Sequence, residues 1–373
     1  MLNKISFNLR QKLKSLLQNV ILPVVYFIFK NIYRKEPELI VFADAHHSEI
    51  PYSMQRLHAE LEKRGYKLTD VFEDYSSMSF IGSSLSAVRF MKTYARARVV
   101  FICDNFLPVA SCRKRKETTV IQLWHSCGLL KKFGYDTTED IPSGYKGNVY
   151  RNYNLLTVSA PALEEVFANA TRLDKSVVRA LGVSRSDIFF DEEWHKDCIA
   201  GFYKQYPEAK NKKVILWAPT FRGNAHTPYL AGIDSIKELQ KSLGEDYFLI
   251  IKAHPHLEAK YSLSSCPIPT ERLLPVTDLL ITDYSSVFFD YLFFGKPSVL
   301  FAPDLEEYEK KRGFYVDYST LCPHIVTDGE KLTKAVLAAL DSNNASHIEE
   351  LKAYHISSCD GGSTERIIKA AGL

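Results

Sequence analysis

Short apolar runs alternate with longer amphipathic stretches along most of the chain. The runs are rich in β-branched and aromatic residues, and the stretches between them repeat apolar residues at helical spacing, as residues 48–64 do before Gly65. Strands that alternate with helices predict parallel sheets covered by helices on both faces. The predicted strands are residues 39–43, 99–103, 120–124 and 155–159 in one series, and 214–218, 248–252, 279–282 and 298–302 in a second.

The two series predict two α/β domains with a cleft between them. Polar character rises at residues 210–213, between the series, and a length of 373 residues also favours two domains. We therefore expect a leader over residues 1–35, an N-terminal domain over 36–208 and a C-terminal domain over 209–373.

The leader carries the basic character of the chain. Residues 1–35 contain seven Lys or Arg residues and no acidic residue, so the net charge of +3 for the whole chain leaves −4 for residues 36–373. An acidic body argues against nucleic-acid binding, because a surface that follows phosphates needs clustered Lys and Arg. The run Arg113-Lys114-Arg115-Lys116 is the exception, and we interpret it as a solvated loop.

The apolar part of the leader, residues 20–29, is too short to cross a membrane. It is ten residues long and contains Pro23, which we expect to interrupt it, whereas a spanning helix needs about 20 apolar residues. No small-residue cleavage site follows, which argues against a signal peptide. Cationic and apolar faces together suit an anionic membrane surface, so we predict a peripheral, amphipathic anchor on the cytoplasmic face of the cell membrane. The alternative is a helix packed on the body.

Composition excludes several other classes of protein. Hydrophobic residues make up 46% of the chain and charged residues 24%, which excludes disorder, collagen and coiled coil. The seven cysteines form no CxxC pair or Cys/His cluster, which argues against a disulfide framework and a structural zinc site. This cysteine usage fits a reducing cytoplasm.

Polar side chains follow four of the predicted strands. In open parallel sheets, ligands bind beyond the carboxyl ends of the strands, so these side chains are candidates for a binding site. They are His125 after residues 120–124, Thr220 and Arg222 after 214–218, His254 after 248–252, and Asp283, Ser285 and Ser286 after 279–282.

Each of these side chains also has a purely structural interpretation. A lone histidine is usually a core or capping residue, and Asp283 or Ser285 could cap a helix. A helix N-terminus with hydroxyl groups is nevertheless also an anion site, and Arg222 offers a bidentate donor that suits phosphate. The occurrence of four such strand ends favours the functional interpretation.

These residues predict an anionic donor held by the second domain and a histidine base in the first. An imidazole can take a proton from an attacking hydroxyl at neutral pH, and a nearby Asp136 would orient the ring of His125. Walker A, GxGxxG, HExxH and GxSxG patterns do not occur in the sequence. The sequence predicts no cofactor and leaves a divalent cation open, because Asp136 and Asp283 do not form a recognisable ligand set.

Read together, these motifs resemble the CDP-glycerol glycerophosphotransferase family of teichoic acid synthesis. The most specific block runs from Leu279 through Asp283-Tyr284-Ser285-Ser286 to Tyr291, and is followed by Lys296-Pro297. Supporting motifs are Ala218-Pro219-Thr220-Phe221-Arg222, Lys252-Ala253-His254-Pro255, Trp124-His125 and Asp360-Gly361-Gly362-Ser363-Thr364-Glu365-Arg366, so the resemblance covers residues 95–370.

The resemblance implies a GT-B fold with two Rossmann-like domains, one for the acceptor and one for the CDP-activated donor, and a last helix that crosses back to the first domain. It implies transfer of a polyol phosphate, first of all glycerol phosphate from CDP-glycerol, to a hydroxyl of an undecaprenyl-type lipid-linked saccharide with release of CMP. His125 would be the base and His254 would act at the donor phosphates. Thr220, Arg222, Ser285 and Ser286 would hold these phosphates with Asp283 nearby, and Glu306 would contact the ribose.

One motif departs from the family pattern. Ser126-Cys127-Gly128 follows Trp-His where the longer polymerases have Gly-Thr-Pro, so the chain is more similar to the short primases that add a first unit. We interpret Cys127 as a small buried residue rather than a nucleophile. Two other functions stay open at this point: a GT-B glycosyltransferase that uses a CMP- or UDP-sugar, and an inactive membrane-bound scaffold, against which the intact polar strand ends argue.

Overall fold

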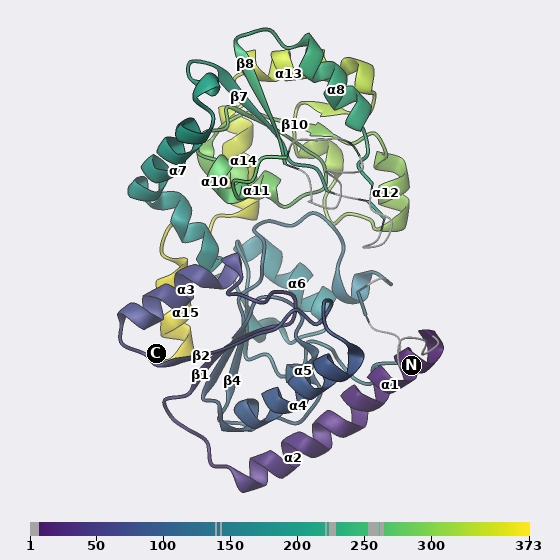
Figure 1. Ribbon diagram of the computed structural model, residues 1–373, viewed down its shortest axis with the longest axis vertical. Helices are drawn as coiled ribbons and strands as arrows, with labels where there is room; N and C mark the ends of the chain where they lie inside the picture. The colour runs from purple at the N-terminus through teal and green to yellow at the C-terminus, as the bar shows by residue number, and fades with distance from the viewer. Residues whose placement is uncertain are drawn as a thin grey trace. The chain divides into compact units, whose positions relative to one another are not determined.

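The structure is a computed structural model that describes residues 7–138, 140–141, 144–220, 222–223, 229–252, 261 and 265–373. It divides into two compact α/β units, which are described separately below (Figure 1). The first unit comprises Met1–His125, Phe133–Ile188 and Ser357–Leu373, and the second comprises Ser126–Lys132 and Phe189–Ile356.

The first unit contains a six-stranded parallel sheet in the order β2-β1-β3-β4-β5-β6. Strands β1, β3 and β4 are almost wholly buried, as expected for a parallel sheet covered on both faces. The half-exposed β2 and the two-residue β6, which the sequence did not predict, form its edges. The bounds are β1 Ile40–Asp44, β2 Leu68–Phe72, β3 Val99–Ile102, β4 Thr119–Gln122, β5 Leu155–Thr157 and β6 Val178–Arg179.

The helices of this unit bury one apolar stripe each. Helix α4, for example, buries Phe90, Met91 and Tyr94, and its N-terminus is capped by the Ser79 hydroxyl, which accepts a hydrogen bond from the Gly82 N–H at 3.1 Å. The helices after the leader are α3 Tyr52–Lys63, α4 Phe80–Arg96, α5 Leu107–Ala110, α6 Glu164–Thr171 and α15 Ser363–Ala371.

The leader is one continuous helix, and our expectation that Pro23 interrupts it is wrong. Helix α1 (Phe7–Leu16), a π-helical turn η2 (Leu17–Ile21) and helix α2 (Leu22–Ile32) follow each other without a break. The Leu22 N–H donates to the Leu17 carbonyl, five residues back. Proline lacks an N–H and clashes with the carbonyl four residues before it, and the wider π turn relieves both problems at the start of α2.

The leader helix packs along the first unit by a narrow face (Figure 1). Leu22 and Tyr26 are buried, and the Tyr26 ring lies 5.1 Å from that of Tyr94 on α4. Most of the remaining surface is solvent-exposed and apolar, with Val24, Phe27 and Ile32 exposed by 52%, 66% and 64%. By length and composition alone, Gln11–Ile32 could cross a membrane. The exposed apolar residues of this helix are Leu9, Leu16, Val20, Ile21, Val24, Phe27, Ile28 and Ile32.

The basic run after α5 is only partly the solvated loop that we expected. Arg115 is half-buried and its guanidinium donates to the carbonyls of Lys30 and Tyr33 at the end of α2 and to that of Ala95 at 2.9 Å. Lys114 donates to the Thr118 carbonyl at 2.6 Å, and burial lowers the pKa of its ammonium group. Cations at a helix C-terminus complement its carbonyls and dipole, so this loop fixes the end of the leader helix.

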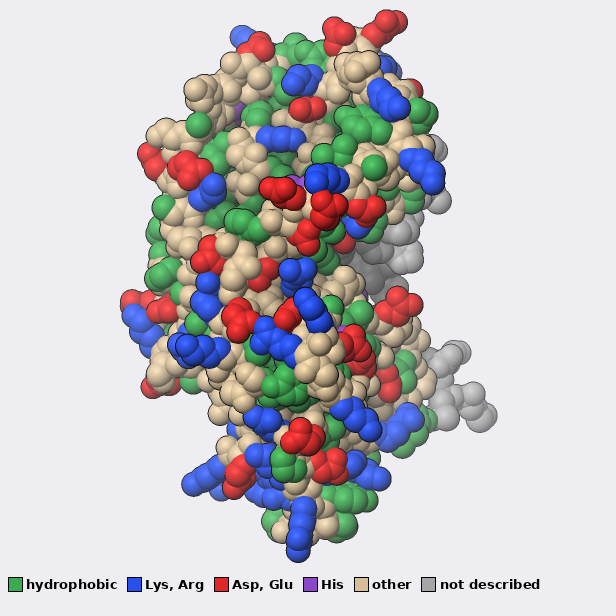
Figure 2. Space-filling model, turned by 90° about the vertical axis from the view of Figure 1, so that its left-hand side faces the viewer, with side chains coloured by type: hydrophobic (Ala, Val, Ile, Leu, Met, Phe, Trp, Pro, Cys, Tyr) green, Lys and Arg blue, Asp and Glu red, His purple; other side chains and the backbone are tan. Residues whose placement is uncertain are grey.

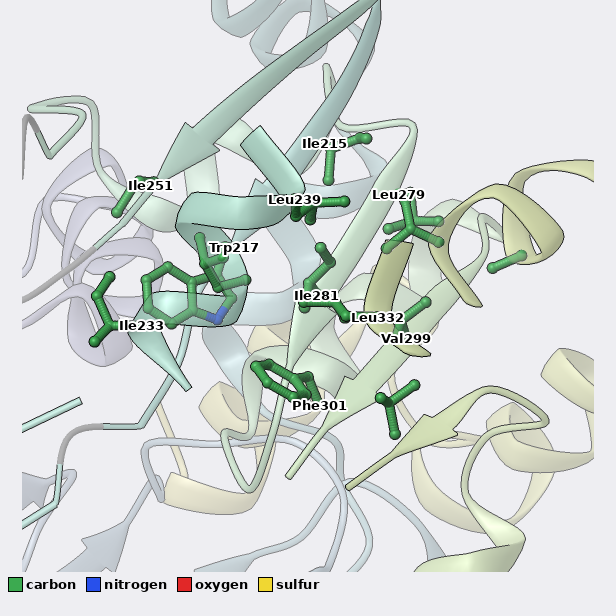
Figure 3. Packing of buried hydrophobic residues seen from close by; sticks show 14 of the residues in the cluster. Ile215, Trp217, Ile233, Leu239, Ile251, Leu279, Ile281, Val299, Phe301 and Leu332 are labelled. Carbon is green, nitrogen blue, oxygen red and sulfur yellow. The ribbon is translucent and has the colours of Figure 1, made fainter. Parts of the chain in front are cut away.

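The second unit contains a five-stranded parallel sheet in the order β11-β10-β9-β7-β8. On one face, Trp217 of β7 and Phe301 of β10 pack with Ile233 and Leu332 from the covering helices (Figure 3). Trp217 is 1% exposed and is the largest fully buried side chain among the described residues. The bounds are β7 Lys213–Trp217, β8 Tyr247–Ile251, β9 Leu279–Thr282, β10 Ser298–Phe301 and β11 Ile325–Val326.

Several helices of the second unit are short. α8 buries Ile233, Ile236 and Leu239 against the sheet, whereas α11, which follows β9, is buried along its whole length and is apolar apart from Asp290. The bounds are α7 Glu192–Gln205, α8 Ile233–Ser242, α10 Thr270–Leu273, α11 Val287–Tyr291, α12 Leu305–Lys311, α13 Leu332–Asp341 and α14 Ala345–His355.

The units exchange chain segments at different points from those we expected. The second unit takes Phe189–Ile356, so α7 belongs to it rather than to residues 36–208, because Phe202 of α7 packs at a ring distance of 6.3 Å from Phe248 of β8. Helix α15 lies in the first unit beside α3. The buried Asp187 carboxylate accepts the Ser363 and Thr364 N–H groups at 3.0 and 2.7 Å and so caps α15.

Candidate functional site

Each sheet has a point where the strand order changes direction. In the first sheet it lies between β1 and β3, and in the second between β7 and β9. Connections leave to opposite sides of an open sheet at such a point, which opens a crevice beyond the carboxyl ends of the two strands. Of the predicted residues, Asp283 follows β9 directly, and Thr220 comes three residues after the end of β7.

The Asp283 carboxylate joins the two strand ends of the second unit. Asp283 is 3% exposed, and its Oδ1 accepts the Thr220 N–H at 2.9 Å and the Tyr284 N–H at 2.6 Å. Its Oδ2 lies 2.9 Å from Nη2 of Arg222. Beside it, the Thr220 hydroxyl is buried and has no hydrogen-bond partner among the described residues.

Arg222 is fully engaged within the protein. Its guanidinium binds Asp304, which follows β10, in a bidentate manner at 2.7 and 3.0 Å, and it also donates to the Thr220 carbonyl. The sequence predicted that this side chain binds phosphate, and it gave Asp304 no role in the site. With a 6% exposed guanidinium between two carboxylates, the structure gives Arg222 the environment of a buried ion triad.

The ion triad is stabilised by charge and by aromatic rings. Burial alone would lower the pKa of Arg222, but the hydrogen bond to Asp304 and the charges of Asp283 and Asp304 raise it. Burial likewise opposes ionisation of Asp304, yet the hydrogen bond from Arg222 holds the pKa of that carboxyl below its ordinary value. The guanidinium carbon lies 4.7 Å from the ring centroid of Tyr284, which stacks on Tyr308 at 3.8 Å. Removal of one partner would leave an uncompensated buried charge.

The other predicted donor-site residues lie close to this triad in sequence. Ser285 and Ser286 are half-buried at the start of α11, and the Ser285 hydroxyl is 3.4 Å from the Val287 N–H. Glu306 is exposed in the first turn of α12, two residues after Asp304. His254 lies outside the described residues.

In the first unit, a strained residue precedes the predicted base. Trp124 has φ 59°, a left-handed conformation that is uncommon for a large side chain. Its N–H donates to the buried Gln122 side chain at 3.0 Å, and its ring packs at 4.9 and 5.0 Å from Phe133 and Phe167. The ring of His125 stacks on Trp124 at 5.1 Å. The aromatic cluster therefore fixes the side-chain direction of His125.

Contacts of His125 favour one tautomer. Its Nδ1 lies 3.3 Å from the Cys103 carbonyl and 3.8 Å from the Asp104 carboxylate. Both groups can only accept, so this geometry places the proton on Nδ1 and leaves the Nε2 lone pair available as a base. The sequence proposed Asp136 for this role. Asp136 is exposed in the 3₁₀ turn Gly134–Asp136, and the carboxylate that lies beside the ring is Asp104, at the end of β3.

The chain leaves the first unit directly after His125. Residues 126–132 belong to the second unit, where Lys131 and Phe314 form an antiparallel bridge and the Tyr315 N–H donates to the Leu130 carbonyl at 2.8 Å. Cys127 is 1% exposed, in agreement with our interpretation that it is a buried small residue. This segment anchors the peptide that follows the base.

Two groups of the second unit hold this segment. Gly128 has φ +70°, and a Cβ at this position would lie 2.2 Å from the Phe289 ring. The Leu129 N–H donates to Nδ1 of His355 at 3.4 Å, and the His355 ring lies 4.6 Å from that of Phe289. Close packing leaves room only for glycine here.

A cavity of about 460 Å³ lies at the direction change of the first sheet. It is lined by residues that follow β1 and β3, including His46 and Asn105, and by Ser84 of α4 and Leu17 of the leader helix. The carboxamide oxygen of Asn105 is buried and has no hydrogen-bond partner among the described residues. Its size is typical of a ligand pocket.

Within the described part of the chain, no three His, Cys, Asp or Glu side chains come together as a metal centre would require. The carboxylates of Asp283 and Asp304 are instead neutralised in part by Arg222.

Comparison with known proteins shows the family to which the chain belongs. A family model described as CDP-glycerol:poly(glycerophosphate) glycerophosphotransferase matches residues 25–371. The teichoic acid ribitol-phosphate primase of Bacillus spizizenii is 33% identical over 304 residues, which are 73% of this chain and 74% of the primase. The teichoic acid glycerol-phosphate primase of Bacillus subtilis is 31% identical over 287 residues, 72% of each chain.

Solved structures show the same fold. The wall teichoic acid polymerase TagF superposes with a TM-score of 0.76 at 21% sequence identity, over 97% of this chain and 96% of that one. The GT-B fold that the sequence predicted is confirmed, as is the family resemblance.

We predict that His355 makes the second unit sensitive to acid. Burial lowers the pKa of His355 to about 4, so between pH about 6.5 and about 4 the unfolded chain binds a proton that the folded chain does not. This group should therefore cost up to roughly 3 kcal/mol of stability as the pH falls through that window. His355→Phe keeps an aromatic ring at this position but cannot take up a proton, so it should remove this pH dependence. Urea unfolding at several pH values measures it, and an unchanged slope in the variant would assign the effect to another group.

We predict that Gly128→Ala destabilises the segment after the base. The left-handed backbone and the contact with Phe289 together should cost about 2–4 kcal/mol. Gly201→Ala is the control, because Gly201 lies within α7 with open space around it and alanine should be neutral or slightly stabilising there. Denaturant unfolding of both variants checks this, and equal stability of the two would contradict the packing described for residues 126–132.

Proposed function

Because the chain belongs to the CDP-glycerol:poly(glycerophosphate) glycerophosphotransferase family, we propose that it transfers glycerol phosphate from CDP-glycerol to a hydroxyl of a lipid-linked saccharide. The family covers polyol-phosphate transfer in teichoic acid synthesis. A variant of the polymerase TagF has been solved after soaking with CDPG, which supports the choice of donor.

The strand ends of the second unit support donor binding there. Three hydroxyl groups follow the two strands at which the strand order changes direction, and they belong to Thr220, Ser285 and Ser286. The Thr220 hydroxyl is buried and has no hydrogen-bond partner among the described residues. This is the observation that carries the proposal. We assign these hydroxyls to the phosphates, together with His254, and Glu306 to the ribose. Arg222 and Asp283 act as positioning residues, because their charges are paired with each other.

The contacts of His125 in the first unit support its proposed role as the general base. His125 has Nδ1 turned to the Cys103 carbonyl and Asp104, so Nε2 can accept a proton. In the proposed step the acceptor oxygen attacks the β-phosphorus of CDP-glycerol and its proton passes to Nε2. A new phosphorus–oxygen bond forms as the bond to the bridging oxygen breaks, and CMP leaves with that electron pair. Asp104 orients the imidazole and stabilises its charged form.

The leader helix and the first cavity support a lipid-linked acceptor. The helix exposes a row of apolar side chains and has basic residues along it, as helices that lie in a membrane interface do. The cavity that Leu17 and Asn105 line combines an apolar wall with an unpartnered carboxamide oxygen, which suits an amphiphilic molecule. We propose that the protein works at the cytoplasmic face of the membrane and that this cavity binds the acceptor.

The chain matches the primases over nearly three quarters of their length, which supports addition of a first unit. The two primases differ in their polyol, so ribitol phosphate is the alternative donor group within the family. A nucleotide sugar is the alternative outside it. Incubation with CDP-glycerol, CDP-ribitol, a CMP-sugar and a UDP-sugar distinguishes the three donor classes, which are CDP-glycerol, CDP-ribitol and nucleotide sugars. The measurements are the nucleotide released and the mass of the product.

We predict that His125→Ala loses about 10²–10⁴-fold in the rate of CMP release, as expected for loss of a general base. Asp104→Asn should lose less, because it acts through the ring. His347→Ala is the control and should keep wild-type turnover, since His347 contacts only the Leu321 carbonyl among the hydrogen bonds described. CDP-glycerol binding, measured by calorimetry, should be unchanged in all three. Near-normal turnover of His125→Ala would end the assignment of the base.

We predict that Ser84→Trp, which fills the first cavity, raises KM for a lipid-linked acceptor by on the order of tenfold while KM for the donor is unchanged. Leu85→Trp is the matched control, because Leu85 lies on the same helix with 55% of its side chain exposed and does not line the cavity. Equal acceptor KM values for the two variants would exclude the cavity as the acceptor site.

A further inference from the structure

A second cavity in the first unit lies on the other side of the leader helix, and no step of the proposed reaction uses it. It has a volume of about 540 Å³ and is lined by Pro23 and Phe27 of α2, by Cys112 and Arg113 after α5, and by Tyr145 and Arg151. All of these residues belong to the first unit.

The π turn of the leader helix builds one wall of this cavity. Asn19 lies in the π turn, and its carboxamide donates to the Gly144 carbonyl at 3.1 Å and accepts the Lys146 N–H at 3.1 Å. The Ser15 hydroxyl also donates to the Gly144 carbonyl at 3.1 Å. The loop that carries Tyr145 and Lys146 is thereby fixed against the helix. A π turn is rare and often marks a functional site, and here it directs Asn19 at this loop.

The lining is strongly cationic. Four of its side chains are basic and, among the described lining residues, none is acidic. Glu117 acts electrostatically on Tyr26 and on Lys114 but is not part of the lining. These cations also act on Cys112, which lines the cavity. Burial raises the pKa of the Cys112 thiol to about 12, and the positive charges of Arg151 and Lys30 oppose that rise. The four basic residues of the lining are Lys30, Arg113, Lys146 and Arg151.

An acceptor or donor for a ligand is also present. The Tyr145 hydroxyl is buried and has no hydrogen-bond partner among the described residues, although Tyr145 lines the cavity. Buried polar groups without a partner are rare in folded proteins, because each costs about 1–3 kcal/mol. A hydroxyl of a residue that lines the same cavity as four basic side chains matches an anionic oxygen that accepts several hydrogen bonds.

The cavity lies next to the exposed apolar row of the leader helix, because Phe27 belongs to both. Phe27 lines the cavity and is 66% exposed, and Val20 and Val24 of the same row are 49% and 52% exposed. Lys and Arg side chains also gather at the lower end of the view in Figure 2, where α2 ends. Arg34, two residues after α2, is exposed, as is Lys92, whose Nζ lies 5.2 Å from the ring centroid of Tyr33. A helix that lies in the interface with its apolar row in the acyl layer holds adjacent cations at the depth of the lipid phosphates.

We propose that this cavity is a binding site for the phosphate of a membrane lipid, held by Lys30, Arg113, Lys146 and Arg151 with the Tyr145 hydroxyl. The inference rests on the proposed membrane association of the leader helix. Its ligand is a phosphate ester or diphosphate that carries an apolar chain, and either a bulk glycerophospholipid or a prenyl diphosphate can supply this group.

Titration calorimetry of the full chain with two soluble probes tests the site. The probes are dihexanoyl-phosphatidylglycerol below its critical micelle concentration and geranyl diphosphate. We expect saturable binding of at least one of them, with one site per chain. Binding of the glycerophospholipid alone would assign the site to bulk lipid, binding of the diphosphate alone would assign it to the lipid carrier, and absence of saturable binding of both would overturn the proposal.

Two variants test the residues. Arg113→Gln combined with Lys146→Gln removes two exposed cations from the rim, and Tyr145→Phe removes the hydroxyl without a change of charge. We expect the double variant to lose on the order of tenfold or more in affinity, as for lost charge-assisted hydrogen bonds, and Tyr145→Phe to lose several-fold. The control is Lys175→Gln combined with Arg179→Gln, which removes the same charge from exposed positions of the same unit and should bind as the wild type does.

The readouts separate this inference from the proposed function. Thermal unfolding first establishes that all variants are folded. CMP release from CDP-glycerol with a soluble acceptor should be equal in the wild type and in both variants, because the cavity takes no part in the chemistry. Loss of probe binding with intact CMP release identifies the lipid site, whereas absence of CMP release from the wild type would contradict the proposed function and leave the binding result unaffected. Equal probe affinity in the double variant and its control would overturn the assignment.

Discussion

The buried carboxylate of Asp283 is the constraint on which the candidate donor site depends. It joins the ends of β7 and β9 through the Thr220 N–H and, through Arg222, it is linked to Asp304 after β10. Three neighbouring strands of the sheet are therefore fixed at their carboxyl ends by one group of charges. Because these charges are paired, we propose that they hold the backbone around Thr220 in place and that neutral donors make the contacts to an anionic ligand.

The candidate base depends on a different kind of constraint. Trp124 adopts a left-handed conformation within an aromatic cluster, and the chain passes into the second unit immediately after His125. Phe289 packs closely against Gly128, and Nδ1 of His355 accepts a hydrogen bond from the Leu129 N–H, so both hold the residues that follow His125. The side chain of His125 is thus oriented by Trp124 of the first unit. The residues that follow it, 126–132, are packed within the second unit. Strain of this kind persists only where the surroundings determine it fully.

Apolar runs predicted the buried strands well, because a strand covered on both faces needs a continuous apolar sequence. The edge strands β2, β6 and β11 carry no such run and were missed. Strand-end chemistry proposed Thr220, Asp283 and His125 as candidates, and it did not propose Asp304 or Asp104, since the contacts of these two residues are set by the tertiary fold across as many as 82 residues. Pro23 was misjudged for a local reason: a π turn, which no sequence pattern announced, accommodates it within a continuous helix.

A crystal structure of the protein with bound CDP-glycerol would show where the donor binds. We expect the diphosphate beyond the ends of β7 and β9, with its oxygens at hydrogen-bond distance from the hydroxyls of Thr220, Ser285 and Ser286, and we expect Arg222 to stay paired with Asp283 and Asp304. A nucleotide bound at another part of the second unit, or a phosphate that takes Arg222 away from both carboxylates, would contradict this expectation.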